Sequence, residues 1–153
     1  MKSVELKTKE IVAAYTILSK AKYQKLSDED KISIWKIMKA LKPTAAAFDE
    51  ESKDAQKQFS PYEDFANDCN MAAQYIVAKK AGSKDLPMTE EQYKRIDEEF
   101  GKYKALVDKA LAETKEKPVT VEFKALSEDA FSKLMASNDW TLSEVNVLEF
   151  IVE

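Results

Sequence analysis

The chain contains no histidine. Histidine is the commonest general base, the usual partner of a serine or cysteine nucleophile, and the commonest ligand of transition metals in proteins. The absence of histidine therefore argues against a histidine general base, against serine or cysteine nucleophiles paired with histidine, and against most transition-metal sites. The sequence therefore predicts a protein that is not an enzyme and that carries no cofactor.

Cysteine, glycine and proline are also scarce, with one, two and four residues. So few turn formers indicate long helices joined by few tight turns. The single cysteine, Cys69, cannot form an intrachain disulfide, which suits a reducing compartment. The N-terminus has no apolar signal-peptide core, and no run approaches the ~20 apolar residues that span a bilayer. We therefore expect a soluble, cytoplasmic protein without a membrane partner.

Charge of both signs is abundant, with 24 Lys and Arg against 28 Asp and Glu in 153 residues. The lysines are interleaved with acids on the same helix faces, which argues against a specific nucleic-acid partner. Apolar residues make up 44% of the chain, which is enough for a core. A single helical domain over residues 1–153 is predicted.

Residues 89–114 show the clearest helical pattern. Thr89 and Gln92 make a capping box, and Pro87 stops an upstream helix from running in. A seam of apolar side chains at alternating steps of three and four residues predicts packing along another helix. It comprises Tyr93, Ile96, Phe100, Tyr103, Val107 and Ala110.

A second long helix is predicted to begin after Ser27, a cap residue followed by three acids. Its apolar phase continues from Ile34 to Phe59 across Pro43, a residue that normally ends or kinks a helix. The unbroken phase favours one long helix bent near residues 40–43. The alternative is a break, with Thr44 as a new cap.

Shorter elements complete the pattern. Residues 8–23 and 127–136 are predicted helices, and a further helix is expected to start at the Ser60–Pro61 cap and to stop near Gly82. Residues 142–152 can be drawn as helix or strand, and the Thr141/Glu144 capping box favours helix.

Two segments alternate apolar and polar residues, as a half-buried strand does. They are residues 1–6 and 118–124, and because one strand cannot stand alone, they are expected to pair. The predicted fold is all-α: an antiparallel bundle of about five helices with long central helices and a minor two-stranded element.

Acidic side chains provide an alternative, enzymatic interpretation. Glu50, Glu51 and Asp54 could face Asp68 and its neighbours Glu63 and Asp64 across a helical hairpin, and carboxylates are the ligands that Mg²⁺ prefers. The run EESKD resembles the EExxE motif of the all-α nucleotide pyrophosphohydrolases, with Asp54 in place of the last Glu. The ExxD half of that motif is missing. This alternative is a Mg²⁺-dependent nucleotide hydrolase, and the competing interpretation is the solvated face of amphipathic helices.

Other candidate groups favour packing or binding over catalysis. Cys69 lies on an apolar face with no histidine to activate it, as a small buried hydrophobe does. Trp35 lies beside the Ile34 seam and, with Ile32, forms a second apolar edge. An exposed aromatic side chain on a helix flank is typical of contact with a partner chain. Lys36, Lys39 and Lys42 lie next to it.

Residues 4–43 and 126–153 resemble segments of small phage and prophage proteins of unknown function. The resemblance consists of a leading strand, a helix with an AYxxL core, a long charged helix, an Asn-Asp turn and a capped closing helix. It implies a role in virion assembly or an accessory role. The predicted function is a non-enzymatic interaction or assembly protein, phage or mobile-element borne, that binds a protein partner or itself through helix faces. An acidic mimic of nucleic acid is a third possibility, against which the interleaved lysines speak.

Overall fold

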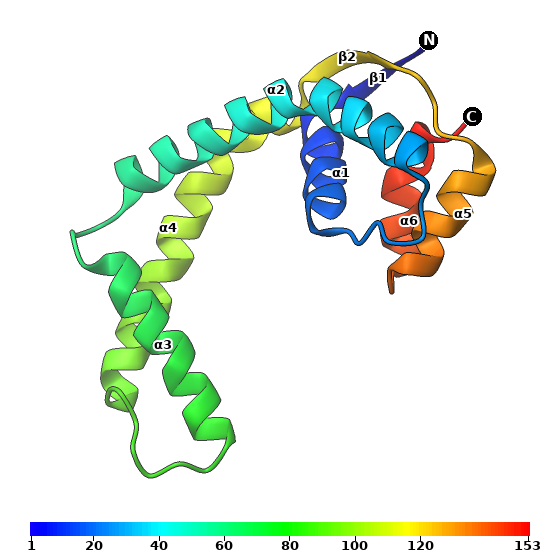
Figure 1. Ribbon diagram of the computed structural model, residues 1–153. Helices are drawn as coiled ribbons and strands as arrows, with labels where there is room; N and C mark the ends of the chain where they lie inside the picture. Colours follow the sequence, from blue (N-terminus) through cyan, green and yellow to red (C-terminus); the bar gives the residue numbers. More distant parts are fainter. The chain divides into compact units, whose positions relative to one another are not determined.

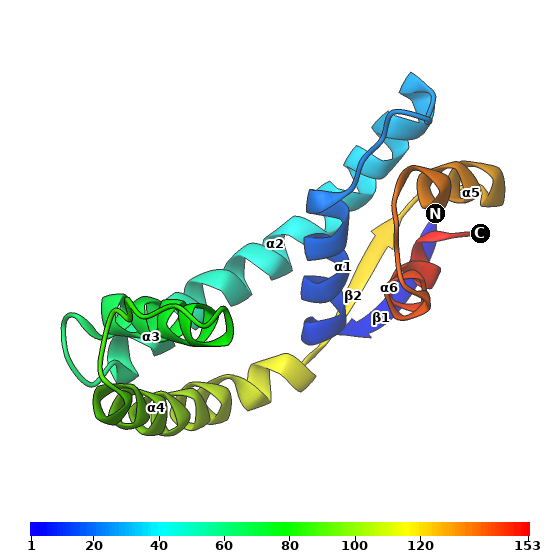
Figure 2. The ribbon, with the colours of Figure 1, turned by 90° about the horizontal axis from the view of Figure 1, so that it is seen from below.

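A computed structural model describes residues 1–153 (Figures 1 and 2). The chain forms six α-helices, one short 3₁₀ helix and two strands, which confirms the prediction of a mostly helical fold with a minor two-stranded element. It divides into two compact units, Met1–Glu50 with Glu113–Glu153, and Glu51–Ala112. We describe each unit by itself, and a single domain stays a prediction.

The elements follow the chain in this order: β1 Lys2–Lys7, α1 Thr8–Lys20, α2 Asp28–Phe59, α3 Phe65–Lys80, α4 Glu90–Glu116, β2 Pro118–Phe123, α5 Glu128–Ser137, α6 Leu142–Leu148 and η1 Glu149–Ile151. None of the helices is both long enough and apolar enough to cross a membrane.

The predicted strands pair as expected. β1 and β2 lie antiparallel, with Val4 opposite Val121 and Leu6 opposite Val119 (Figure 1). Every second residue of each strand is sheltered while the residues between are exposed, because successive side chains of a strand point to opposite faces. The sheet therefore has one face on the core and one in solvent.

The core of the first unit gathers under this sheet. It joins side chains of α1, the start of α2, β2, α5 and α6. The last residues close this unit, because the Leu126 amide donates to the Ile151 carbonyl at 2.7 Å and the Glu153 amide donates to the Leu126 carbonyl at 3.0 Å. The fully buried members with large side chains are Ile11, Leu18, Ile34, Ile37, Leu41, Leu126, Leu134, Leu148 and Ile151.

Helix α2 is continuous through Pro43, so the prediction of one long helix is confirmed. The Ser27 hydroxyl accepts a hydrogen bond from the Asp30 amide at 3.1 Å, which is the predicted cap. The predicted bend near Pro43 stays a prediction.

Helices α3 and α4 form an antiparallel hairpin in the second unit (Figure 1). The predicted start of α3 at the Ser60–Pro61 cap is wrong. The Ser60 hydroxyl donates to the Tyr62 carbonyl at 3.0 Å and closes a turn, so the helix begins only at Phe65. At the other end, Gly82 has φ +72°, which confirms it as the left-handed terminator.

The capping box of α4 is confirmed, since Thr89 and Gln92 exchange backbone-to-side-chain hydrogen bonds at 2.9 and 3.1 Å. Its buried residues are Ile96, Val107 and Leu111, whereas the predicted seam residues Phe100 and Ala110 are exposed. The predicted seam follows a coiled-coil period of 3.5 residues. An uncoiled helix has 3.6 residues per turn, so a seam with the coiled-coil period drifts around it by ~20° per heptad.

The chain's last elements are helical. Thr141 and Glu144 make the predicted capping box, α6 follows, and η1 leads into Val152, which bridges to Leu126. The helical interpretation of residues 142–152 is confirmed except at that final bridge.

Candidate interaction surface

The outer face of α2 carries the residues that the sequence predicted for partner contact. Ile34, Ile37 and Leu41 turn into the core and are at most 2% exposed. Because a helix turns about 100° per residue, Ile32 and Trp35 then face solvent, with exposed fractions of 53% and 56%. Their predicted exposure is confirmed, and their role as partner contacts stays a prediction.

The Trp35 ring is held by a neighbour on the same helix. The ammonium group of Lys39 lies 4.6 Å from the centre of the indole, one helical turn along. A cation over the face of an indole is attracted by the ring's negative face, by ~0.5–1 kcal/mol at exposed sites. This contact favours one orientation of an otherwise mobile side chain.

A groove of about 600 Å³ adjoins Ile32. It lies within the first unit, between α2 and the end of β2, and Phe123 contributes a buried apolar wall. Its lining residues are Met1, Glu29, Ile32, Ser33, Lys36, Glu122, Phe123 and Lys124. The groove therefore combines apolar side chains with two carboxylates and two ammonium groups.

The same face of α2 is locally basic. No acid occurs between Lys31 and Phe48, although the whole chain carries a net charge of -4. Lys36, Lys39 and Lys42 are exposed and make no ion pair within the chain. We call Ile32, Trp35, Lys36, Lys39 and Lys42 the α2 strip.

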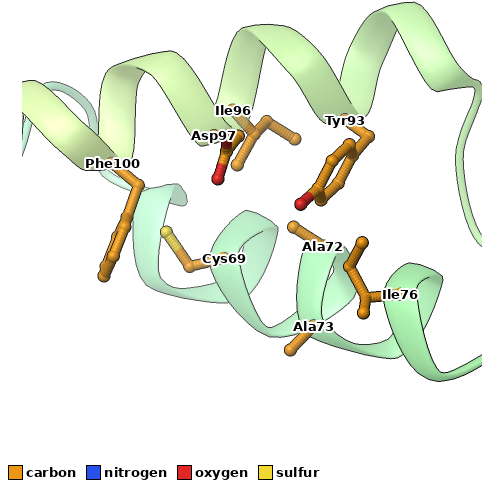
Figure 3. A pocket seen from close by; sticks show the side chains of 8 residues that line it. All are labelled: Cys69, Ala72, Ala73, Ile76, Tyr93, Ile96, Asp97 and Phe100. Atoms are coloured by element: carbon orange, nitrogen blue, oxygen red, sulfur yellow. The ribbon is translucent and has the colours of Figure 1, made fainter.

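A smaller pocket of about 240 Å³ lies between α3 and α4 in the second unit (Figure 3). Ala72, Cys69 and Phe100 line it, and Asp97 is its one charged lining residue. Burial, with a smaller contribution from the charge of Asp68, raises the pKa of the Cys69 thiol. Cys69 is therefore held as a protonated thiol, which is the poor nucleophile that its apolar position predicted.

Aromatic side chains hold the α3–α4 hairpin together. Tyr75 stacks on Tyr93 with ring centres 4.8 Å apart, and Phe65 meets Tyr103 edge to face at 5.1 Å. These geometries are the favoured ones for aromatic pairs. These tyrosines are thus part of the packing of this unit.

The carboxylates of the Mg²⁺ alternative do not converge. No group of three or more His, Cys, Asp or Glu side chains is placed to hold a metal ion. Asp68 instead accepts a hydrogen bond from the Tyr62 hydroxyl at 2.6 Å, and that bond is the main cause that raises the pKa of Tyr62 to about 12. The convergence of Glu50, Glu51, Asp54 and Asp68 that the alternative hydrolase hypothesis requires is therefore not found. Glu63 and Asp64 lie before the start of α3 at Phe65.

Sequence reasoning missed two features of the α2 surface. It identified Ile32 and Trp35 because they lie off the apolar seam, but the groove also needs Phe123 and Lys124, which only the folded chain brings near. The acid-free run from Lys31 to Phe48 could have been found by counting charges along one helix. Comparisons with protein-family models, curated proteins and solved structures found no match.

Proposed function

We propose that this chain is a non-enzymatic protein-interaction or assembly protein that binds a partner chain through the α2 strip. The observation that carries the proposal is the exposure of Ile32 and Trp35 side by side on one helix face, next to an apolar groove. Tryptophan is among the residues most enriched at the energetic centres of interfaces. Its large apolar area is withdrawn from water only when a partner covers it.

The proposal includes a cytoplasmic location and an origin in a phage or mobile element. The lone Cys69 suits a reducing compartment, and the origin rests on the resemblance of residues 4–43 and 126–153 to phage and prophage proteins.

Photo-crosslinking from the α2 strip tests the proposed function. A photoreactive phenylalanine analogue replaces Trp35 in the full chain, which is then irradiated in extract of the cells that produce it. We expect a discrete crosslinked polypeptide, which is either a partner or a second copy of the chain.

Leu142 is the matched control position. It is a large apolar residue of the first unit, 76% exposed, and it lies on α6. Crosslinking from position 35 but not from position 142 supports the proposal. Equal crosslinking from both positions, or none from position 35, contradicts it.

A further inference from the structure

We infer that the partner's docking segment is an acidic amphipathic polypeptide segment, which places one large apolar side chain against Ile32 and Trp35 and its carboxylates beside Lys36, Lys39 and Lys42. This inference rests on the proposed function, since it names the chemistry of the partner at the same surface.

The charges of the α2 strip support the acidic character. Its three lysines follow one another at three-residue intervals and so span ~9 Å of helix axis. None of them is neutralised by a carboxylate of the chain, whereas Lys31, at the strip's start, already pairs with Asp28 at 3.9 Å. A partner that places carboxylates beside these three lysines supplies the negative charge that the chain itself does not place within ion-pair distance of them.

The groove favours a polypeptide over a nucleic acid or an anionic membrane. Glu29 and Glu122 line it together with Lys36 and Lys124, so the groove itself offers no surplus of positive charge to the closely spaced phosphates of a duplex or a lipid surface. A polypeptide can place an uncharged apolar side chain between those two acids and keep its own carboxylates one or two turns further along. The arrangement of apolar groove and lysines on one helix therefore matches a segment with separated apolar and acidic parts.

A second copy of the chain fits this surface poorly. In a two-fold symmetric contact the same patch meets itself, so the three lysines of one copy would approach the three lysines of the other. Like charges placed opposite each other oppose association. The acidic segment is therefore assigned to a different chain.

Selection of peptides from a random library tests this inference. A yeast-displayed library of random 16-residue peptides is selected against the full-length protein, and the binders are sorted again with the Trp35→Ala variant. We expect peptides that bind the wild-type chain and lose binding to Trp35→Ala, and that are enriched in Asp and Glu and contain a large apolar residue.

Two triple variants measure how much the charges of the α2 lysines contribute to peptide binding. The variant that combines Lys36→Ala, Lys39→Ala and Lys42→Ala should bind the selected peptides with about tenfold lower affinity than the wild type. The loss is limited because each exposed ion pair adds only a small increment of binding free energy. The matched control replaces Lys80, Lys84 and Lys109 by alanine. These are three exposed lysines of the second unit without ion pairs, so the two triple variants have the same net charge as each other. The control should bind like the wild type.

The outcomes separate the partner's chemistry from the docking surface. Peptides that need Trp35 but show no acidic enrichment, or equal weakening by both triple variants, overturn the acidic partner and leave the proposed function standing. Failure to obtain any peptide that needs Trp35 overturns both. Tighter binding of a 20-base-pair DNA duplex or of phosphatidylserine vesicles than of the selected peptides, lost with the three α2 lysines, overturns the acidic partner in favour of that ligand.

Discussion

Ile32 and Ile37 lie five residues apart on α2 and on different faces of it. Ile37 is fully buried, and Ile32 is 53% exposed. We predict that Ile37→Ala lowers the free energy of unfolding by ~2–4 kcal/mol, through lost burial and the cavity left behind. The matched Ile32→Ala change should stay within ~0.5 kcal/mol. Urea unfolding followed by circular dichroism measures both, and equal losses would show that the helix is rotated relative to the structure.

Glu116 makes the clearest charge cluster of the first unit. Its carboxylate lies 2.8 Å from the Lys7 ammonium and 2.6 Å from that of Lys9. The hydrogen bonds from these two lysines lower the pKa of Glu116 from 4.5 to about 2. The group thus binds its proton less readily in the folded chain than in the unfolded one. Its stabilising contribution is fully present above pH 4.5 and is lost as the pH falls towards 2.

A prediction for Glu116 follows from the lowering of its pKa in the folded chain. Glu116→Gln should reduce stability only modestly at pH 7, because the ion pairs are exposed and screened, and the difference from wild type should be smaller at pH 2, where the carboxylate is partly protonated. Urea unfolding at the two pH values measures this. A difference that persists or grows in acid would contradict the assigned ion pairs.

At the scale of elements, α4 contains a glycine that its packing does not require. A Cβ added at Gly101 would meet no atom within 4 Å. Gly101→Ala should therefore raise the free energy of unfolding by ~0.5–1 kcal/mol, because alanine is the better helix former. Thermal unfolding measures the shift. Gly82→Ala is the opposite control and should destabilise, since Gly82 has φ +72°. A destabilising Gly101→Ala would contradict the open surroundings.

Asn138 joins the ends of two helices that are distant in sequence. Its side-chain oxygen accepts from the Lys22 amide at 2.8 Å, and its side-chain nitrogen donates to the carbonyls of Lys22 and Leu134 at 3.0 and 2.9 Å. Asn138→Ala removes all three bonds and should cost ~1.5–3 kcal/mol. Chemical unfolding measures the loss, with Asn70→Ala on the exposed face of α3 as the control. A cost equal to that of the control would show that the link is dispensable.

The helices were predictable where local chemistry decides them. Ser27, Thr89 and Thr141 cap helices as predicted, because a cap depends only on residues within one turn. The start of α3 was predicted wrongly. The Ser60 hydroxyl donates to the Tyr62 carbonyl within a turn, and the Tyr62 hydroxyl donates to Asp68. The buried face of α4 was predicted only in part, because Phe100 and Ala110 of the predicted seam are exposed and Leu111, outside it, is buried.

At the scale of the whole molecule, the candidate surface was only half predictable. A side chain off an apolar seam is exposed, so Trp35 could be chosen from the sequence. The wall opposite Ile32 comes from β2, far away in the chain, and only tertiary packing places it there. Likewise, the acidic runs read as one possible metal site until the folded chain showed no cluster able to hold an ion.

The proposed function requires that the α2 strip is open on the isolated chain. Fluorescence of Trp35 tests this most directly, in a Trp140→Phe variant that leaves it as the one tryptophan. Because Trp35 is 56% exposed, we predict emission close to that of tryptophan in water and strong quenching by acrylamide at every protein concentration. Blue-shifted emission with weak quenching at the lowest protein concentration would show that the chain itself covers Trp35, and would contradict the claim.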